Sequence, residues 1–318
     1  MIGEMFMKRR EKQYYKKINF WMKNQGLEIF LSIFLLIVVL IIVGKEIRLL
    51  RTDEYISEII SKGIDYEAFR DIKINENILE ESDINLAKLL EKHPSLQGYA
   101  YVDPIGYLTF TMLAKNYNPE ASGYLDDYVF LRGIADLVET EAFRELYDYY
   151  RAIINDLQYF PVPFSNREEA RISYENSWFS LRNYGGKRRH EGTDIMTETN
   201  QRGLIPVVSM TDGIIEKMGW LEKGGYRIGI RSPSSGYFYY AHLDSYAPNL
   251  QEGDQVIAGQ MLGFMGDSGY GEEGTVGEFP VHLHLGIYIS SRIGEMSVNP
   301  YNILKILENY RISYIHNE

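Results

Sequence analysis

The sequence predicts an α+β protein with one N-terminal transmembrane helix, a helical extracytoplasmic region and a C-terminal domain built mainly from an antiparallel β-sheet. Three observations predict this class. Residues 27–43 are almost wholly apolar, residues 45–160 repeat apolar and charged positions at helical spacing, and glycine-rich turns separate short β-type runs beyond residue 160. Because hydrophobic residues make up 45% of the chain and aromatic residues 14%, it can build a real core and is not mainly disordered.

The first element is the apolar run "LEIFLSIFLLIVVLIIV", in which only Glu28 and Ser32 are polar. A helix of about 18 residues covers a hydrocarbon core of about 30 Å, so we predict a transmembrane helix over residues 27–44. Residues 1–26 contain seven basic and two acidic residues. The positive-inside rule keeps this basic segment in the cytoplasm and places the rest outside, as a single-pass protein of the cell membrane. The alternative, a cleaved signal peptide, needs small residues at a cleavage site, whereas "GKEIRLLR" follows this run.

The second element is a helical extracytoplasmic region over residues 45–160. Asp83 is predicted to cap a helix in "DINLAKLLEKHP", and His93 with Pro94 is predicted to end it. Further breaks are expected at the glycines near residues 98, 106 and 123. No heptad pattern is sustained over three or four repeats, which favours a compact helical domain over a coiled-coil stalk. This region shows no residue pattern that predicts chemistry.

The third element begins at "FPVPF" and is predicted to form one domain over residues 161–318. Short β-type runs such as "YRIGIR", "YFYYAHL" and "HLHLGIYI" are separated by "DG", "GG" and "SPSSG" turns. This spacing predicts an antiparallel sheet. A short helix in "NPYNILKILENY" is expected to close the chain.

Charge and cysteine content exclude several kinds of function. The formal net charge is −11 although the first 26 residues are basic, so the predicted ectodomain is strongly acidic and no nucleic-acid partner is expected. The chain has no cysteine, which excludes disulfides, thiolate nucleophiles and cysteine-ligated zinc. Any metal site must therefore use histidine, aspartate or glutamate.

Four of the six histidines lie in the third element before its closing helix, at positions 190, 242, 282 and 284. In "PVHLHLGIYI", alternation along a strand places His282 and His284 on one face. The opposite, core-facing side is expected to hold Val281, Leu283 and Leu285. One imidazole can then bind a metal while the other acts on the substrate or water held there.

Two further patterns complete a possible metal site. In "RRHEGTDIM", a turn at Gly192 lets His190 and Asp194 fold onto one ion, and in "YFYYAHL" we expect Phe238, Tyr240 and His242 to share a strand face. Taken alone, the first pattern is equally an exposed polar turn and the second a buried core histidine. Together, His190, Asp194 and one of the paired histidines give two imidazoles and a carboxylate with a fourth position open, as catalytic zinc keeps for water. Peptide hydrolysis is the chemistry that this set predicts.

The ordered motifs "HEGTDI", "TDGII", "YYAHL", "EGDQVIAGQMLGFMGDSG", "HLHLGI" and "VNP" resemble the lysostaphin/LytM-type zinc endopeptidases, which act on bacterial peptidoglycan. The resemblance covers roughly residues 162–300. It implies a LytM-type domain with one Zn²⁺ per chain, held by His190, Asp194 and His284. It also implies that His242 and His282 are catalytic, and that peptidoglycan peptides are the substrate. Tyr184 and Tyr240 are expected to line the substrate groove.

Three other interpretations use the same residues. Domains of the family that this chain resembles also serve as scaffolds or regulators in cell-wall remodelling or sporulation complexes, but all five metal and catalytic positions are complete here, which favours an enzyme. "GDSG" at 266–269 resembles a serine-protease loop but leaves His190, Asp194 and the paired histidines unused. "EGDQVIAGQML" resembles a biotinyl or lipoyl carrier hairpin, yet residues 253–269 contain no lysine for attachment.

Overall fold

The computed structural model describes the chain in four stretches, residues 2–121, 127–183, 186–292 and 294–315. The chain divides into two compact units, residues 1–58 and 59–318.

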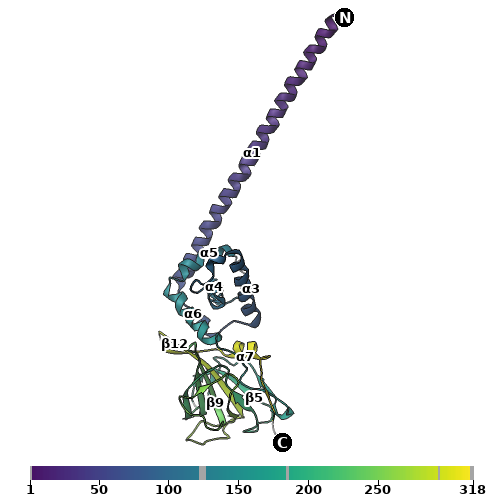
Figure 1. The fold of residues 1–318 in the computed structure, drawn as a ribbon. Helices are drawn as coiled ribbons and strands as arrows, with labels where there is room; N and C mark the ends of the chain where they lie inside the picture. The colour runs from purple at the N-terminus through teal and green to yellow at the C-terminus, as the bar shows by residue number, and fades with distance from the viewer. Residues whose placement is uncertain (1, 122–126, 184–185, 293, 316–318) are drawn as a thin grey trace. The chain divides into compact units, whose positions relative to one another are not determined.

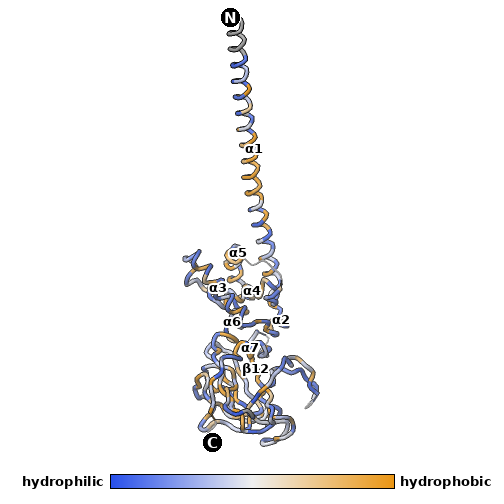
Figure 2. Tube along the Cα trace, turned by 90° about the vertical axis from the view of Figure 1, so that its right-hand side faces the viewer, coloured by the Kyte–Doolittle hydropathy of each residue, from blue (hydrophilic) through white to orange (hydrophobic). Residues whose placement is uncertain are grey.

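The first unit is made of one long helix, α1 (Ile2–Lys62), whose last residues belong to the second unit. Figure 2 shows an uninterrupted hydrophobic stretch in its middle. Its apolar side chains, including Phe30 and Leu35, are exposed. Among the described residues, α1 is the one helix long and apolar enough to cross a membrane, a property that signal sequences share.

The second unit begins with short helices that start at recognisable caps. They are α2 (Tyr66–Arg70), α3 (Glu76–Lys92), the 3₁₀ turn η1 (Pro94–Leu96), α4 (Pro104–Ala114), α5 (Asp127–Leu137) and α6 (Glu141–Ile154). The side chains of Asn75, Asp103 and Thr140 each accept a hydrogen bond from a first-turn backbone N–H, which fixes the starts of α3, α4 and α6.

Two sequence-based expectations for these helices are wrong. Asp83 lies inside α3, because Asn75 caps that helix two turns earlier; the predicted end at His93 is confirmed. Gly106 does not separate helices but lies in the first turn of α4, where an added Cβ would come within 1.8 Å of the Tyr101 carbonyl oxygen. It is therefore a packing glycine. Gly123 lies outside the described residues.

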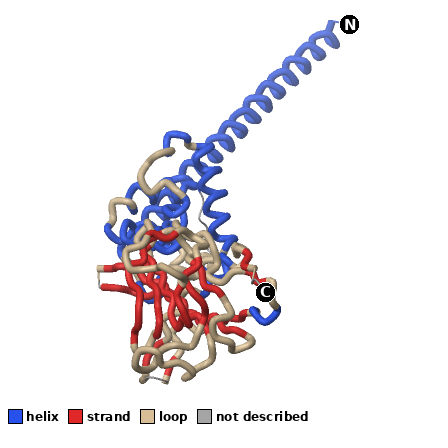
Figure 3. The backbone as a smooth tube through the Cα atoms, turned by 60° about the horizontal axis from the view of Figure 1, so that its bottom comes forward, coloured by secondary structure: helices blue, strands red, loops and turns tan. Residues whose placement is uncertain are grey.

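The rest of the second unit is mainly antiparallel β-structure, as predicted (Figure 3). Its strands are β1 (Phe164–Ser165), β2 (Ile172–Tyr174), β3 (Leu181–Arg182), β4 (Arg188–Arg189), β5 (Thr193–Thr197), β6 (Pro206–Val208), β7 (Gly213–Leu221), β8 (Gly225–Arg231), β9 (Tyr237–Tyr246), β10 (Gln255–Val256), β11 (Met261–Met265), β12 (His282–Ser291), β13 (Gly294–Val298) and β14 (Ser313–Tyr314). It also contains a 3₁₀ turn, η2 (Glu168–Ala170), and the closing helix α7 (Tyr301–Leu307).

Ten of these strands form one sheet. Its main path runs β10-β7-β8-β9-β12-β5-β2; β11 pairs with β6 and β9, and β13 pairs with β12. The strands β9 and β12 lie at its centre and carry alternating side chains to its two faces. One face is the core face, where Leu283, Leu285 and Ile287 of β12 are fully buried.

The helices and the sheet share one hydrophobic core. Phe69 of α2, Leu108 of α4 and Tyr150 of α6 belong to the same buried cluster as Leu283 of β12. The helices gather at one end of the strands (Figure 1). The domain boundary expected after residue 160 stays a prediction, since residues on both sides of it pack into this common core.

Candidate active site

A cavity of about 630 Å³ opens on the face of the sheet that turns away from the core. Strands β12, β9 and β8 contribute His284, Tyr239 and Arg227 to it, and the segment before β5 contributes His190. The predicted alternation of β12 is confirmed: Leu283 and Leu285 are fully buried in the core, whereas His282 and His284 line the cavity.

Strand pairing brings Asp194 beside His284. In the β12–β5 ladder these two residues are direct partners across the strands. His190 precedes β5 by three residues, and Gly192 between them lets the imidazole of His284 approach. An added Cβ at Gly192 would lie 2.5 Å from Cε1 of that ring. The absence of a side chain at this position is what allows the three polar residues to converge.

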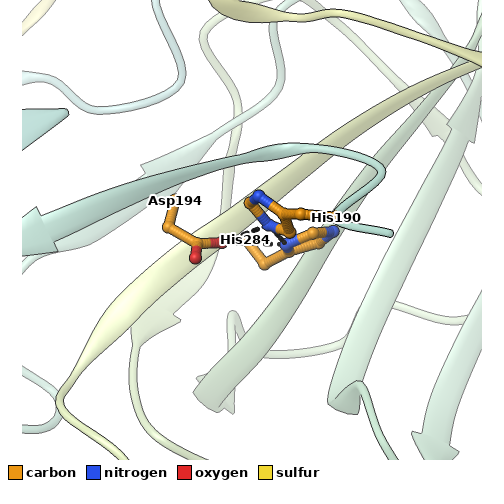
Figure 4. Close-up of side chains that lie close together, drawn as sticks. All are labelled: His190, Asp194 and His284. Carbon is orange, nitrogen blue, oxygen red and sulfur yellow. Dashed lines mark hydrogen bonds and ion pairs between the residues drawn. The ribbon is translucent and has the colours of Figure 1, made fainter. Parts of the chain in front are cut away.

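The side chains of His190, Asp194 and His284 point toward one another (Figure 4). Oδ1 of Asp194 lies 3.0 Å from Nε2 of His190 and 2.9 Å from Nδ1 of His284, and these two nitrogens are 3.1 Å apart. Two imidazole nitrogens and one carboxylate oxygen form the donor set of a typical catalytic zinc site. The three atoms are close enough to share one ion, so these residues fit such a metal.

The carboxyl group of Asp194 is held in its ionised form. Burial alone would raise its pKa, but hydrogen bonds from His190 and His284 and the charge of His284 outweigh burial and hold the pKa well below its usual value. The second oxygen, Oδ2, accepts a hydrogen bond of 2.6 Å from Arg182 Nη2. Asp194 therefore directs one oxygen to the histidines and the other to an arginine, and it meets a cation as a carboxylate.

His190 is held from behind by residue Ser177. Its Nδ1 lies 3.0 Å from the Ser177 hydroxyl oxygen and 3.2 Å from the Ser177 carbonyl oxygen. When Nε2 binds a metal, Nδ1 carries the proton and donates a hydrogen bond to such an acceptor. Ser177 thus supplies the partner that a metal-binding imidazole requires.

His242 and His282 form a second pair in the same cavity, with ring centroids 4.7 Å apart. Nδ1 of His242 lies 2.8 Å from the Ser268 carbonyl oxygen, and Nδ1 of His282 lies 2.8 Å from the Pro280 carbonyl oxygen. Because a carbonyl only accepts, Nδ1 carries the proton in both rings. Burial lowers the pKa of both histidines, so each is neutral near pH 7 and its Nε2 carries no proton. Nε2 of His282 lies 3.7 Å from Oδ1 of Asp194.

His242 reaches the cavity because β9 contains a bulge. Tyr240 pairs with Ile228 and Leu243 with Tyr226, so two residues of β9, Ala241 and His242, stand opposite one residue of β8. His242 has a positive φ of 62° at this point. The bulge breaks the strict alternation on which the sequence-based expectation depended.

The expectation that Tyr240 and Phe238 share a face with His242 is wrong, whereas the expectation for Tyr184 stays a prediction. Tyr240 and Phe238 do not share a face with His242: both are fully buried in the core, and the Tyr240 hydroxyl accepts a hydrogen bond of 2.9 Å from the backbone N–H of Met210. Tyr240 does not line the cavity. Tyr184 lies outside the described residues.

The cavity lining also includes residues that no sequence pattern predicted. Four of them are tyrosines, Tyr237, Tyr239, Tyr270 and Tyr288. Two of these tyrosines lie against glycines. An added Cβ at Gly229 would lie 1.9 Å from the Tyr237 hydroxyl oxygen, and one at Gly286 would lie 2.6 Å from the Tyr288 ring. The position of Tyr288 could have been predicted from the sequence, because strand alternation places it on the same face of β12 as His282 and His284.

The structure gives no support to a serine nucleophile at "GDSG". Ser268 is fully buried, and its hydroxyl donates a hydrogen bond of 2.6 Å to the Leu243 carbonyl while accepting one from the Tyr226 N–H. Its role is to tie two strands together. Its backbone carbonyl, and not its hydroxyl, contacts His242.

Comparisons with known proteins agree with this geometry. The sequence profile of peptidase family M23 matches residues 188–300. The L-Ala–D-Glu endopeptidase of Bacillus subtilis is 40% identical over 168 residues, covering 53% of this chain and 49% of that protein. Lysostaphin of Staphylococcus simulans is 32% identical over 118 residues, covering 36% of this chain and 21% of that protein. The chain thus spans about half or less of these curated relatives.

One solved structure resembles most of the chain. It is a Ruminococcus gnavus protein described as a LytM glycyl-glycine endopeptidase, 45% identical, with a TM-score of 0.65. The alignment covers 80% of this chain and 95% of that one. The similarity therefore extends beyond the residues that carry the motifs and includes part of the helical region.

Proposed function

Because the chain belongs to peptidase family M23, we propose that it is a metal-dependent endopeptidase that hydrolyses peptide bonds in bacterial peptidoglycan. The observation that carries this proposal is the convergence of His190, Asp194 and His284 beside two neutral imidazoles in one cavity. Three side chains that can bind a metal therefore lie beside two imidazoles that can transfer protons.

In this proposal His190 Nε2, Asp194 Oδ1 and His284 Nδ1 hold one zinc ion per chain. The ion would supply Lewis-acid polarisation of the scissile carbonyl and would lower the pKa of water. The ionised Asp194 reduces the positive charge of the bound site, and Arg182 fixes the direction of its carboxylate. Ser177 accepts a hydrogen bond from Nδ1–H of His190 and so would keep Nε2 turned to the ion.

His242 and His282 perform the proton transfers. Each has its Nδ1 proton committed to a carbonyl, so Nε2 accepts the proton that the attacking water loses. The protonated ring then delivers this proton to the leaving amine, while Nε2 of the other ring accepts a hydrogen bond from the N–H of that amine.

The cavity suits a peptide that carries a carboxylate. Although the chain is acidic overall, the cavity lining includes Arg182, Arg188 and Arg227. A glutamyl residue keeps one carboxylate outside its peptide bond and so matches a cationic cavity. The relative named for L-Ala–D-Glu cleavage is also the more similar of the two curated relatives above. We therefore propose a bond next to a glutamyl residue as the substrate bond.

We further propose that α1 anchors the protein in the cell membrane with its N-terminus in the cytoplasm. The apolar stretch of α1 and the basic residues before it support this arrangement. The second unit then faces the cell wall, where peptidoglycan lies. Partner proteins of a cell-wall or sporulation complex remain a proposal on the family resemblance alone.

The test is cleavage of defined peptidoglycan fragments by the purified protein, with products identified by mass spectrometry. We expect cleavage next to the glutamyl residue, loss of cleavage in a chelator, recovery with Zn²⁺, and no effect of a serine-directed reagent. Cleavage of glycine cross-bridges alone would refute the proposed bond. A protein that retains zinc but cleaves no fragment would refute the enzyme and favour a scaffold.

A further inference from the structure

Arg70, at the end of α2, reaches from the helical region to the hairpin that carries the cavity histidines. Its Nε donates a hydrogen bond of 2.8 Å to the carbonyl of Ser297, and its Nη2 donates one of 2.8 Å to the Ser297 hydroxyl. Ser297 lies on β13 and pairs with Tyr288 of β12, the strand of His282 and His284. The side chain of Arg70 is only 16% exposed, so these are interior contacts.

The same guanidinium packs on a short segment that we call the aromatic turn, residues 176–180. Its carbon Cζ lies 4.6 Å from the ring centroid of Phe179 and 5.6 Å from that of Trp178, both within cation–π range. Phe179 has a positive φ of 57°, which a bulky residue keeps only when its surroundings hold it there. The guanidinium on its ring is one such restraint.

The aromatic turn in turn holds His190. The N–H of Phe179 bonds to the His190 carbonyl at 2.9 Å, and the N–H of His190 bonds to the Ser180 carbonyl at 3.0 Å. Ser177 of the same turn provides two of the three contacts of His190 Nδ1, and Nη2 of Arg182, at 3.2 Å, provides the third. The turn and His190 flank the two-stranded sheet of β3 and β4 and lie outside the ten-stranded sheet, so these contacts, rather than the main sheet, set the position of the ring.

We propose that Arg70 is a positioning residue for the metal site, which clamps the aromatic turn to β13 and thereby fixes His190 relative to His284. The inference rests on the metal site proposed above. It also gives the helical region a role in the chemistry, since Arg70 joins the aromatic turn, which bonds to His190, to β13, which pairs with the strand of His284. Glu191, which follows His190, adds a weaker contact to the same guanidinium at 3.4 Å.

The chain offers a close control in Arg311. Its Nε and Nη2 donate hydrogen bonds to the carbonyls of Val162 and Pro163 at 2.7 and 2.8 Å, and its guanidinium packs on Phe164 at 4.3 Å. It makes the same kinds of contact as Arg70, but none with a residue of the cavity. Substitution of Arg311 therefore measures the effect of removing an arginine that has only a structural role.

The test compares Arg70→Met and Arg311→Met in the full-length protein, with three readouts. They are amide hydrogen exchange in the metal-free protein, Zn²⁺ affinity by competition with a chelator, and the visible absorption spectrum of the Co²⁺-loaded protein. For Arg70→Met we expect faster exchange at Phe179 and His190, Zn²⁺ affinity lower by about 10-fold, and a changed Co²⁺ spectrum. For Arg311→Met we expect all three to match wild type.

Arg70→Lys separates position from charge, because an ammonium group cannot make the two-pronged contact or stack on the rings. It should behave like Arg70→Met. If Arg70→Met does not fold, Phe179→Leu replaces it, because this variant removes the ring beneath the guanidinium but leaves the Ser297 bonds. Unchanged exchange at His190 in the folded variants would overturn the inference, as would equal effects of Arg70→Met and Arg311→Met. A wild-type protein that binds no metal would instead refute the metal site, and hydrogen exchange would still decide the role of Arg70.

Discussion

At the scale of single residues, the candidate site depends on what is absent at one position. Gly192 has no side chain, and the space where a Cβ would stand is taken by the imidazole of His284 and the Leu285 carbonyl oxygen, each about 2.6 Å away. Neither neighbour has room to move, since one is a proposed ligand and the other is backbone of a central strand. The glycine is thus as specific a requirement as the polar residues around it.

We expect Gly192→Ala to destabilise the fold by about 1–3 kcal/mol, as overpacking of an interior does, and to weaken Zn²⁺ binding by displacing His284. Denaturant unfolding and a chelator competition measure the two effects. Gly44→Ala is the control, because an added Cβ there has no atom within 4 Å. Zinc affinity equal to wild type in Gly192→Ala would show that the close approach does not matter for binding.

The two histidines of β12 should separate by function. Loss of a ligand empties the site, whereas loss of a group that only transfers protons leaves the ion bound. We therefore expect His284→Ala to lose zinc, and His282→Ala and His242→Ala to stay loaded while turnover falls by about 10²–10⁴-fold. Elemental analysis beside turnover on one substrate measures this. A metal-free His282→Ala with a loaded His284→Ala would reverse the assignment.

At the scale of elements, β9 serves both the core and the cavity. Tyr239 faces the cavity and Tyr240 faces the core, as alternation requires, and the bulge after Tyr240 then returns His242 to the cavity side. Without that extra residue His242 would follow Tyr240 into the core. The irregularity is therefore what completes the pair with His282.

Neighbouring tyrosines of β9 should respond differently to mutation. Tyr240→Phe removes the partner of the buried Met210 N–H, so we expect a loss of about 1–3 kcal/mol in stability with KM unchanged. Tyr239→Ala should instead raise KM for peptidoglycan fragments several-fold, since it removes part of the cavity floor. Unfolding and steady-state kinetics distinguish them. A raised KM for Tyr240→Phe together with lost stability alone for Tyr239→Ala would mean that the two faces of β9 are exchanged.

Local patterns predicted most of the strands, the faces of β12 and the residues that converge on the donor cluster. They failed at β9, because a bulge is set by pairing with β8 and not by the residues of β9 alone. They also missed Arg182 and Arg70. The contact between Arg70 and Ser297 joins residues 227 positions apart, and no periodicity or turn signal in either segment announces it.

At the scale of the whole molecule, helices α2–α6 and the sheet behave as one folded body. Helices α2, α3, α4 and α6 share a buried cluster with the sheet, and the backbone N–H of Asn299 bonds to the Arg70 carbonyl at 2.8 Å. The helical region thus packs into the same folded body as the sheet. Removal of residues 59–160 would expose core side chains of the sheet portion.

The arrangement of the chain across the membrane is directly testable. If α1 crosses the membrane with its basic end inside, protease added to intact, wall-stripped cells should degrade the protein beyond Lys45. Immunoblotting with an antibody to the C-terminal part follows the loss. Complete protection until the cells are lysed would place the second unit in the cytoplasm.

The contact of Arg70 with the aromatic turn also gives the molecule a built-in optical probe. The ring of Trp178 packs at a tilt against that of Phe179, with ring centroids 4.8 Å apart, and lies 5.6 Å from the Arg70 guanidinium carbon. Indole emission depends on nearby charge, so movement of the turn relative to Arg70 changes the fluorescence of this tryptophan. Only two other tryptophans, Trp21 and Trp220, contribute to the signal. The order of the segment that holds His190 can therefore be followed in real time, in solution and without a label.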